Sequence, residues 1–106
     1  MKTCLFIIFF SLVAYIAYSQ PNCNLYKWSG DSVCYRACQY YSKRSKFAQG
    51  SRGSQMVFDS VIALCPAFDV AYMEKAVPYL KRGDFVTWRI WIDKAVALNP
   101  VEHLGY

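Results

Sequence analysis

Apolar residues recur every three or four positions along most of the chain after residue 32, and this spacing places them on one face of an α-helix. The pattern predicts helices over residues 33–48, 54–65, 68–81 and 85–98, with a fifth beginning near residue 101. No stretch alternates between apolar and polar residues as a half-buried strand would. The sequence therefore predicts an all-α protein.

Short polar connectors separate the predicted helices. Gly50 and Gly53 are expected to end the first helix, Gly83 to end the third, and Asp84 to cap the fourth. Connectors this short make successive helices antiparallel neighbours. Pro78 lies inside the third helix, where it removes a backbone hydrogen bond, so this helix is expected to bend without breaking.

The segment 20–32 is polar and is predicted to be an irregular lead-in to the first helix. Trp28 is expected to pack against the helices that follow. Asp31 or a neighbouring serine can accept a hydrogen bond from a free N–H group at the start of the first helix.

Residues 1–19 have the features of a secretory signal peptide. Lys2 precedes a short apolar run, and Ala17 and Ser19 supply the small residues of a cleavage site. An uncleaved membrane anchor is the alternative, but the run is shorter than the ~20 residues that a spanning helix needs. The mature chain is therefore expected to be secreted or periplasmic.

Four cysteines remain after signal cleavage, Cys23, Cys34, Cys38 and Cys65. An even number in an exported chain suggests two disulfides, although four thiolates could instead bind zinc. In an antiparallel helix pair the end of the second helix lies beside the start of the first. One of Cys34 and Cys38 is therefore predicted to bond Cys65, and Cys23 to bond the other; no metal is expected.

The formal net charge is +5, and the basic residues concentrate in one stretch. No acidic residue occurs between Asp31 and Asp59, an interval that contains Lys43, Arg44 and Lys46, with Arg36 and Arg52 on either side of them. Such a stretch can attract phosphates or anionic lipids, and its simpler interpretation is a solvated helix face. An alternative function is therefore that of a small basic, disulfide-stabilised secreted effector that binds membranes or polyanions.

Candidate catalytic residues are scarce. His103 is the single histidine, is expected at the surface near the start of a helix, and has no second catalytic element beside it in the sequence. Gly50 and Gly53 lack the Lys-Ser/Thr that follows a phosphate-binding loop. Neither catalytic residues nor a cofactor are predicted, so the chain is not expected to be an enzyme.

A repeat of 34 residues is suggested by two similar helix endings, Leu64-Cys65-Pro66 and Leu98-Asn99-Pro100. The unit 69–100 resembles a tetratricopeptide repeat, while Lys75 and Trp88 depart from the pattern by replacing a Leu and a small Ala. The positions that match its pattern are Tyr72, Ala76, Tyr79, Ile92, Ala95 and Pro100.

The resemblance implies an α-solenoid of antiparallel helix-turn-helix repeats. Residues 33–66 form a degenerate repeat, residues 69–100 the clear one, and residues 101–106 the truncated start of a third. A stack that stops there leaves the fourth helix without a neighbour. A truncated product of a longer gene would explain this ending, and self-association through the exposed C-terminal repeat is the alternative.

The resemblance also implies a non-catalytic scaffold that binds a protein or peptide on its concave face. No nucleic acid partner is expected, and no membrane partner after signal cleavage. The contact surface would be mainly apolar, which suits a helix or an extended peptide. In the clear repeat this face would be formed by Val70, Met73, Val77, Leu80 and Lys81. The alternative is that these apolar residues pack against a further repeat.

Overall fold

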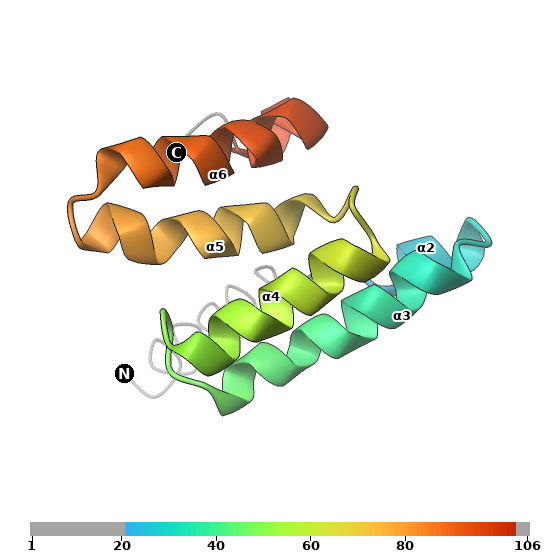
Figure 1. Cartoon of the computed structure of the whole chain (residues 1–106). Coiled ribbons are helices and arrows are strands. Elements are labelled where there is room, and N and C mark those ends of the chain that lie inside the picture. Colours follow the sequence, from blue (N-terminus) through green and yellow to red (C-terminus); the bar gives the residue numbers. More distant parts are fainter. Residues whose placement is uncertain (1–20, 104–106) are drawn as a thin grey trace, which may run out of the picture.

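The computed structural model describes residues 21–103, and within this range every regular element is a helix (Figure 1). The prediction of an all-α protein is confirmed for these residues. The predicted signal peptide, residues 1–19, and the end of the chain, residues 104–106, lie outside the described residues. None of the helices between residues 21 and 103 is both long and apolar enough to cross a membrane.

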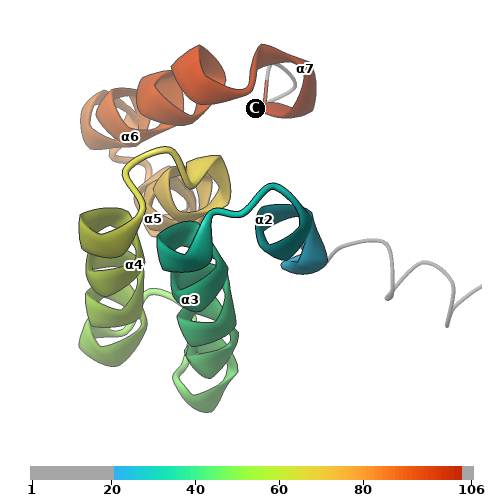
Figure 2. The ribbon, with the colours of Figure 1, turned by 90° about the vertical axis from the view of Figure 1, so that its right-hand side faces the viewer.

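Two helical hairpins form the body of the protein (Figure 1). The first pairs α3, Ser32–Tyr41, with α4, Arg52–Leu64, and the second pairs α5, Asp69–Lys81, with α6, Phe85–Leu98. Helices α4 and α5 also pack together and join the two hairpins. Two short helices, α2 (Asn24–Trp28) and α7 (Pro100–His103), lie at the same end of this body as the start of α5 (Figure 2).

Local capping explains where most helices begin and end. A carboxylate oxygen of Asp31 accepts from the backbone N–H of Cys34 at 3.0 Å, and Asp84 accepts from that of Thr87 at 3.2 Å, as predicted. Gly83 closes the second hairpin with a φ of +77°, a conformation that costs glycine little. The bounds of α6 agree with the predicted range 85–98.

The lead-in prediction for residues 20–32 is wrong in part. Asn24–Trp28 form helix α2, and Trp28 is 73% exposed instead of packed. Five residues are too few to show a helical period in the sequence. A disulfide at Cys23 ties the start of α2 to α3, so a tertiary bond holds this short helix.

The first long helix ends earlier than predicted. Its α-helical part stops at Tyr41, and Ser42–Lys46 form the 3₁₀ helix η1. The hydroxyl groups of Ser42 and Ser45 donate to carbonyl oxygens three residues earlier, at 2.7 and 3.1 Å. Such bonds compete with regular helical pairing, and this polar segment has no apolar side chain to bury.

The turn between α3 and α4 uses its two glycines differently from the prediction. Gly50 reverses the chain with a φ of +80°, whereas Gly53 lies inside the first turn of α4, which begins at Arg52. A Cβ atom on Gly53 would overlap the ring of Phe47. Gly53 therefore provides space for that ring and does not end a helix.

The first hydrophobic core joins α3, α4 and the start of α5. Phe68, which precedes α5, is 1% exposed, and its ring centroid lies 6.0 Å from that of Tyr26 and 5.3 Å from that of Tyr41. Phe68 thus connects α2 and α3 to the second hairpin. The buried members of this core are Ala37, Cys38, Tyr41, Val57, Phe58, Val61, Cys65, Phe68 and Ala71.

The second core lies between α5 and α6 and is built from residues that match the repeat pattern. Ala76 and Ala95 are fully buried and Ile92 is 4% exposed. Trp88, which replaces a small residue of the pattern, is half-buried against this cluster. Helix α5 continues through Pro78, so the prediction of an unbroken helix is confirmed, whereas its bend stays a prediction.

Lys75, the second departure from the repeat pattern, links three helices. Its side chain is 9% exposed, and its ammonium group forms an ion pair with Asp59 of α4. The same group lies 4.4 Å from the ring centroid of Trp91 on α6. A leucine would fill this space but could not pair with the carboxylate of Asp59. The lysine buries its aliphatic stem and places its ammonium group against Asp59 and the Trp91 ring.

We expect the two partners of this ion pair to differ in their sensitivity to substitution. Asp59→Ala leaves a nearly buried ammonium without its carboxylate and should lower the free energy of unfolding by about 1–2 kcal/mol. Lys75→Met keeps the packing and returns a 60% exposed carboxylate to water, so its cost should stay below about 0.5–1 kcal/mol. Urea denaturation of both variants and of the double variant checks this. Equal losses for the two single variants would contradict it.

Candidate functional site

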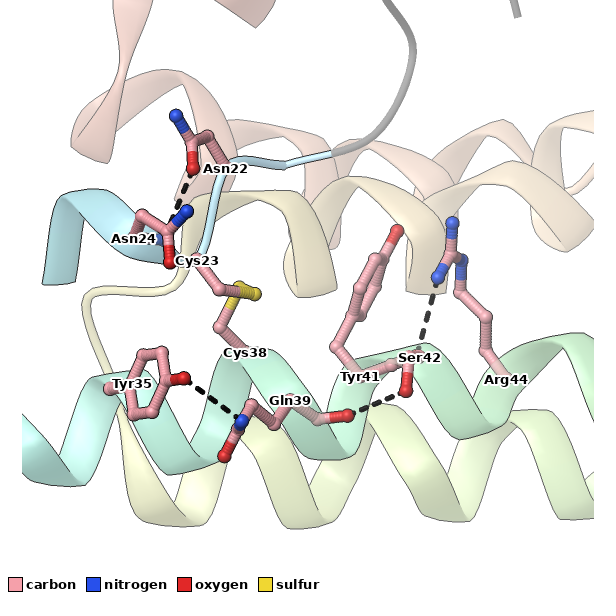
Figure 3. The surroundings of a disulfide bond; sticks show 9 residues. All are labelled: Asn22, Cys23, Asn24, Tyr35, Cys38, Gln39, Tyr41, Ser42 and Arg44. Atoms are coloured by element: carbon pink, nitrogen blue, oxygen red, sulfur yellow. Dashed lines mark hydrogen bonds between the residues drawn. A yellow bond between two sulfur atoms is a disulfide. The ribbon is translucent and has the colours of Figure 1, made fainter. Parts of the chain in front are cut away.

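Two disulfides hold the end of the molecule where the candidate site lies. Cys23 bonds Cys38, with Cα atoms 5.5 Å apart (Figure 3), and Cys34 bonds Cys65, with Cα atoms 5.0 Å apart. The predicted pairing is confirmed, and Cys34 is the one of the two candidate cysteines that bonds Cys65. Because all four sulfurs are bonded in pairs, they cannot serve as the thiolate ligands of the zinc alternative.

A polar cluster joins the start of α5 to α7. His103 Nε2 lies 2.6 Å from Asp69 Oδ2, and the Asn99 side-chain amide donates to the same oxygen at 3.3 Å. His103 is 2% exposed, so its prediction as a surface residue is wrong. The contact spans 34 residues of sequence, and no local pattern could have indicated it.

A groove of about 580 Å³ opens beside this cluster. Its walls come from α2, from the start of α5 and from the α6–α7 junction, and Figure 2 shows α7 and α2 on either side of that end of α5. The volume falls within the range of small-molecule pockets. The lining residues are Pro21, Asn22, Leu25, Tyr26, Ser29, Phe68, Asp69, Val70, Met73, Glu74, Asn99, Glu102 and His103.

Burial and nearby carboxylates raise the pKa of Tyr26, which lines the groove, and of Tyr41, which contacts the groove residue Glu74. Burial raises the pKa of Tyr26, and the nearby carboxylates of Asp69 and Asp31 raise it further. Burial also raises the pKa of Tyr41 well above its ordinary value. The carboxylate of Glu74 adds to this shift and accepts the Tyr41 hydroxyl at 3.3 Å, whereas Arg44 opposes the shift.

The residues predicted for the concave face divide between two places. Val70 and Met73 line the groove. Val77 is half-buried further along α5, and Leu80 is 38% exposed near its end. The Lys81 ammonium contacts the side chain of Gln49, on the connector before α4. Among the described lining residues, only Val70 and Met73 belong to the predicted set.

Sequence reasoning missed the contributions of α2 and α7 to the groove. Leu25 and Tyr26 come from a helix that was predicted to be irregular, and Glu102 and His103 from the last described turn. The one available signal was the pair of cysteines that ties the lead-in to α3. That signal indicates proximity but not which side chains would face α5.

The basic residues between Asp31 and Asp59 do not form one helix face. Arg36 lies on α3, Lys43, Arg44 and Lys46 on η1, and Arg52 on α4. The charged groups of Lys43 and Arg44 lie over the rings of Tyr40 and Tyr41, at 4.6 and 4.0 Å from the centroids. Binding of membranes or polyanions by these residues stays a prediction.

The outer face of α6 and the start of α7 carry exposed apolar side chains. Their exposed fractions range from 44% for Leu98 to 93% for Val101. Self-association through this face stays a prediction. The residues involved are Phe85, Val86, Ile90, Leu98 and Val101.

Comparison with protein-family models, with curated proteins and with solved structures found no significant match to this chain. The fold class and the site therefore follow from the chain's own residues. Two disulfides within residues 21–103 favour an oxidising, extracytoplasmic environment.

Proposed function

We propose that the protein is a non-catalytic, exported interaction scaffold of the tetratricopeptide-repeat type, and that it binds a peptide segment of a partner in the groove between α2, α5 and α7. The groove itself carries this proposal. Val70 and Met73 of α5 lie in it beside Leu25, which is 59% exposed. Apolar side chains that a groove leaves accessible suit an extended or helical peptide.

A repeat architecture is supported by the two antiparallel hairpins and by the second core. Ala76, Ile92 and Ala95 match the repeat pattern, and all three are buried between α5 and α6. Close approach of paired helices needs small residues at such positions. The exposed apolar face of α6 is also what an outer repeat helix would present to a neighbour.

The groove lacks an activated nucleophile among its described residues. Asp69 and His103 resemble two members of a catalytic triad, but a triad also needs a hydroxyl or thiol that donates to the imidazole. The Ser29 hydroxyl, which lines the groove, donates to the backbone oxygen of Tyr26 at 3.0 Å instead. A binding role therefore fits the groove better than hydrolysis.

Selection of a displayed random peptide library on the immobilised protein tests this function. Peptides enriched on the wild type should bind Leu25→Ser about tenfold more weakly, because a leucine contact is lost. Ile90→Ser on α6, also exposed and outside the groove lining, is the matched control and should bind normally. No enrichment, or equal loss in both variants, would contradict a peptide-binding groove.

A further inference from the structure

The charged residues of the groove are all acidic. Asp69, Glu74 and Glu102 line it, and no Lys or Arg does so among residues 21–103. The chain as a whole carries a formal net charge of +5, so the groove is a negative region on a positive protein. Such a local reversal of sign selects partners by charge complementarity.

Two of these carboxylates keep hydrogen-bonding capacity for a ligand. Both contacts of Asp69, from Asn99 and His103, reach Oδ2, and Oδ1 has no hydrogen bond from the described residues. Glu74 uses Oε1 for the Tyr41 hydroxyl and leaves Oε2 without a donor in the same range. An ionised carboxylate accepts through both of its oxygens, so each of these groups can take a further N–H donor.

His103 lies buried beside Asp69 and contacts its carboxylate. Its ring is 2% exposed, yet Nδ1 has no hydrogen-bond partner in the described part of the chain. Because the carboxylate of Asp69 only accepts, Nε2 donates to Oδ2, and this contact together with the Asn99 amide fixes the position of the carboxylate at the groove.

We propose that the segment bound in this groove is a basic peptide, with a Lys or Arg side chain directed at Asp69, Glu74 and Glu102 and apolar neighbours on Leu25 and Met73. This inference rests on the proposed function and adds the chemistry of the partner. Arginine suits the site best, because its planar guanidinium presents several N–H donors to two carboxylates at once.

Three synthetic peptides with the same leucines, and with arginine, glutamine or glutamate at the intervening positions, test the inference. Titrated against the full mature protein at low salt, the arginine peptide should bind most tightly and the glutamate peptide most weakly. The double variant Glu74→Gln/Glu102→Gln should weaken the arginine peptide by about two- to fivefold per carboxylate and leave the glutamine peptide unchanged.

The controls separate a charged site from general attraction. The amide oxygen that Glu74→Gln introduces can still accept the Tyr41 hydroxyl, so this change keeps that internal contact. Asp93→Asn removes a 65% exposed carboxylate of α6 outside the groove lining and should not change binding of the arginine peptide. If Asp93→Asn weakens binding as much as the groove variants do, the attraction is general and the inference is overturned.

The remaining outcomes distinguish this inference from the proposed function. If the glutamine peptide binds as tightly as the arginine peptide and Leu25→Ser weakens both, the groove binds peptides but the basic partner is wrong. If none of the three peptides binds, the basic partner is also wrong. The library selection with Leu25→Ser then decides the proposed function alone, because it does not depend on charge.

Discussion

Replacing Phe68 by alanine should lower the free energy of unfolding by about 3–5 kcal/mol. The ring is 1% exposed and packs against Tyr26 and Tyr41, so its removal leaves a cavity where α2, α3 and α5 meet. The two disulfides cross-link α2, α3 and the end of α4, which limits how far these helices can move to fill the space. Urea denaturation followed by circular dichroism measures the loss.

Phe85→Ala is the matched control for Phe68→Ala. Phe85 begins α6 and is 61% exposed, so the same truncation should cost less than about 1 kcal/mol there. Because Phe68 also lines the groove, Phe68→Ala should in addition weaken any peptide selected on the wild type. Similar losses of stability for the two variants would mean that Phe68 is not the junction of the core.

The double variant Cys34→Ala/Cys65→Ala should lose about 3–4 kcal/mol of stability. Its disulfide closes a loop of 31 residues between α3 and the end of α4, and opening that loop returns conformational freedom to the unfolded chain. The double substitution leaves the other disulfide intact and creates no free thiol. Alanine also avoids placing a buried hydroxyl at Cys65, which is 1% exposed.

The second disulfide provides an internal comparison. Cys23–Cys38 closes a loop of only 15 residues, so Cys23→Ala/Cys38→Ala should be milder by about 0.6 kcal/mol in loop entropy. It should nevertheless affect the groove more, because Cys23 holds α2 and with it Leu25 and Tyr26. If either double variant unfolds at the same denaturant concentration as the wild type, the disulfide that it lacks does not stabilise the fold as proposed.

The sequence by itself determined the helices whose signals are local. Asp31 and Asp84 cap helices because their carboxylates reach N–H groups three residues away, and Gly83 ends one because its φ is positive. That Cys65 bonds one of Cys34 and Cys38, and Cys23 the other, also followed, since hairpin geometry places the end of one helix beside the start of its partner; the choice between the two did not. These signals act over a few residues or over one connector, so the features that they specify can be predicted without knowledge of the whole fold.

The tertiary structure alone decided what the groove contains. Val70 and Met73 were predicted for a binding face from the resemblance to a repeat, but α2 was mistaken for an irregular segment and His103 for a surface residue. Asp69 and His103 are 34 residues apart in the chain, and their contact depends on how α7 folds back over α5. Asp69 and Glu74 share α5, but Glu102 comes from α7, and only packing brings these two helices to the same groove.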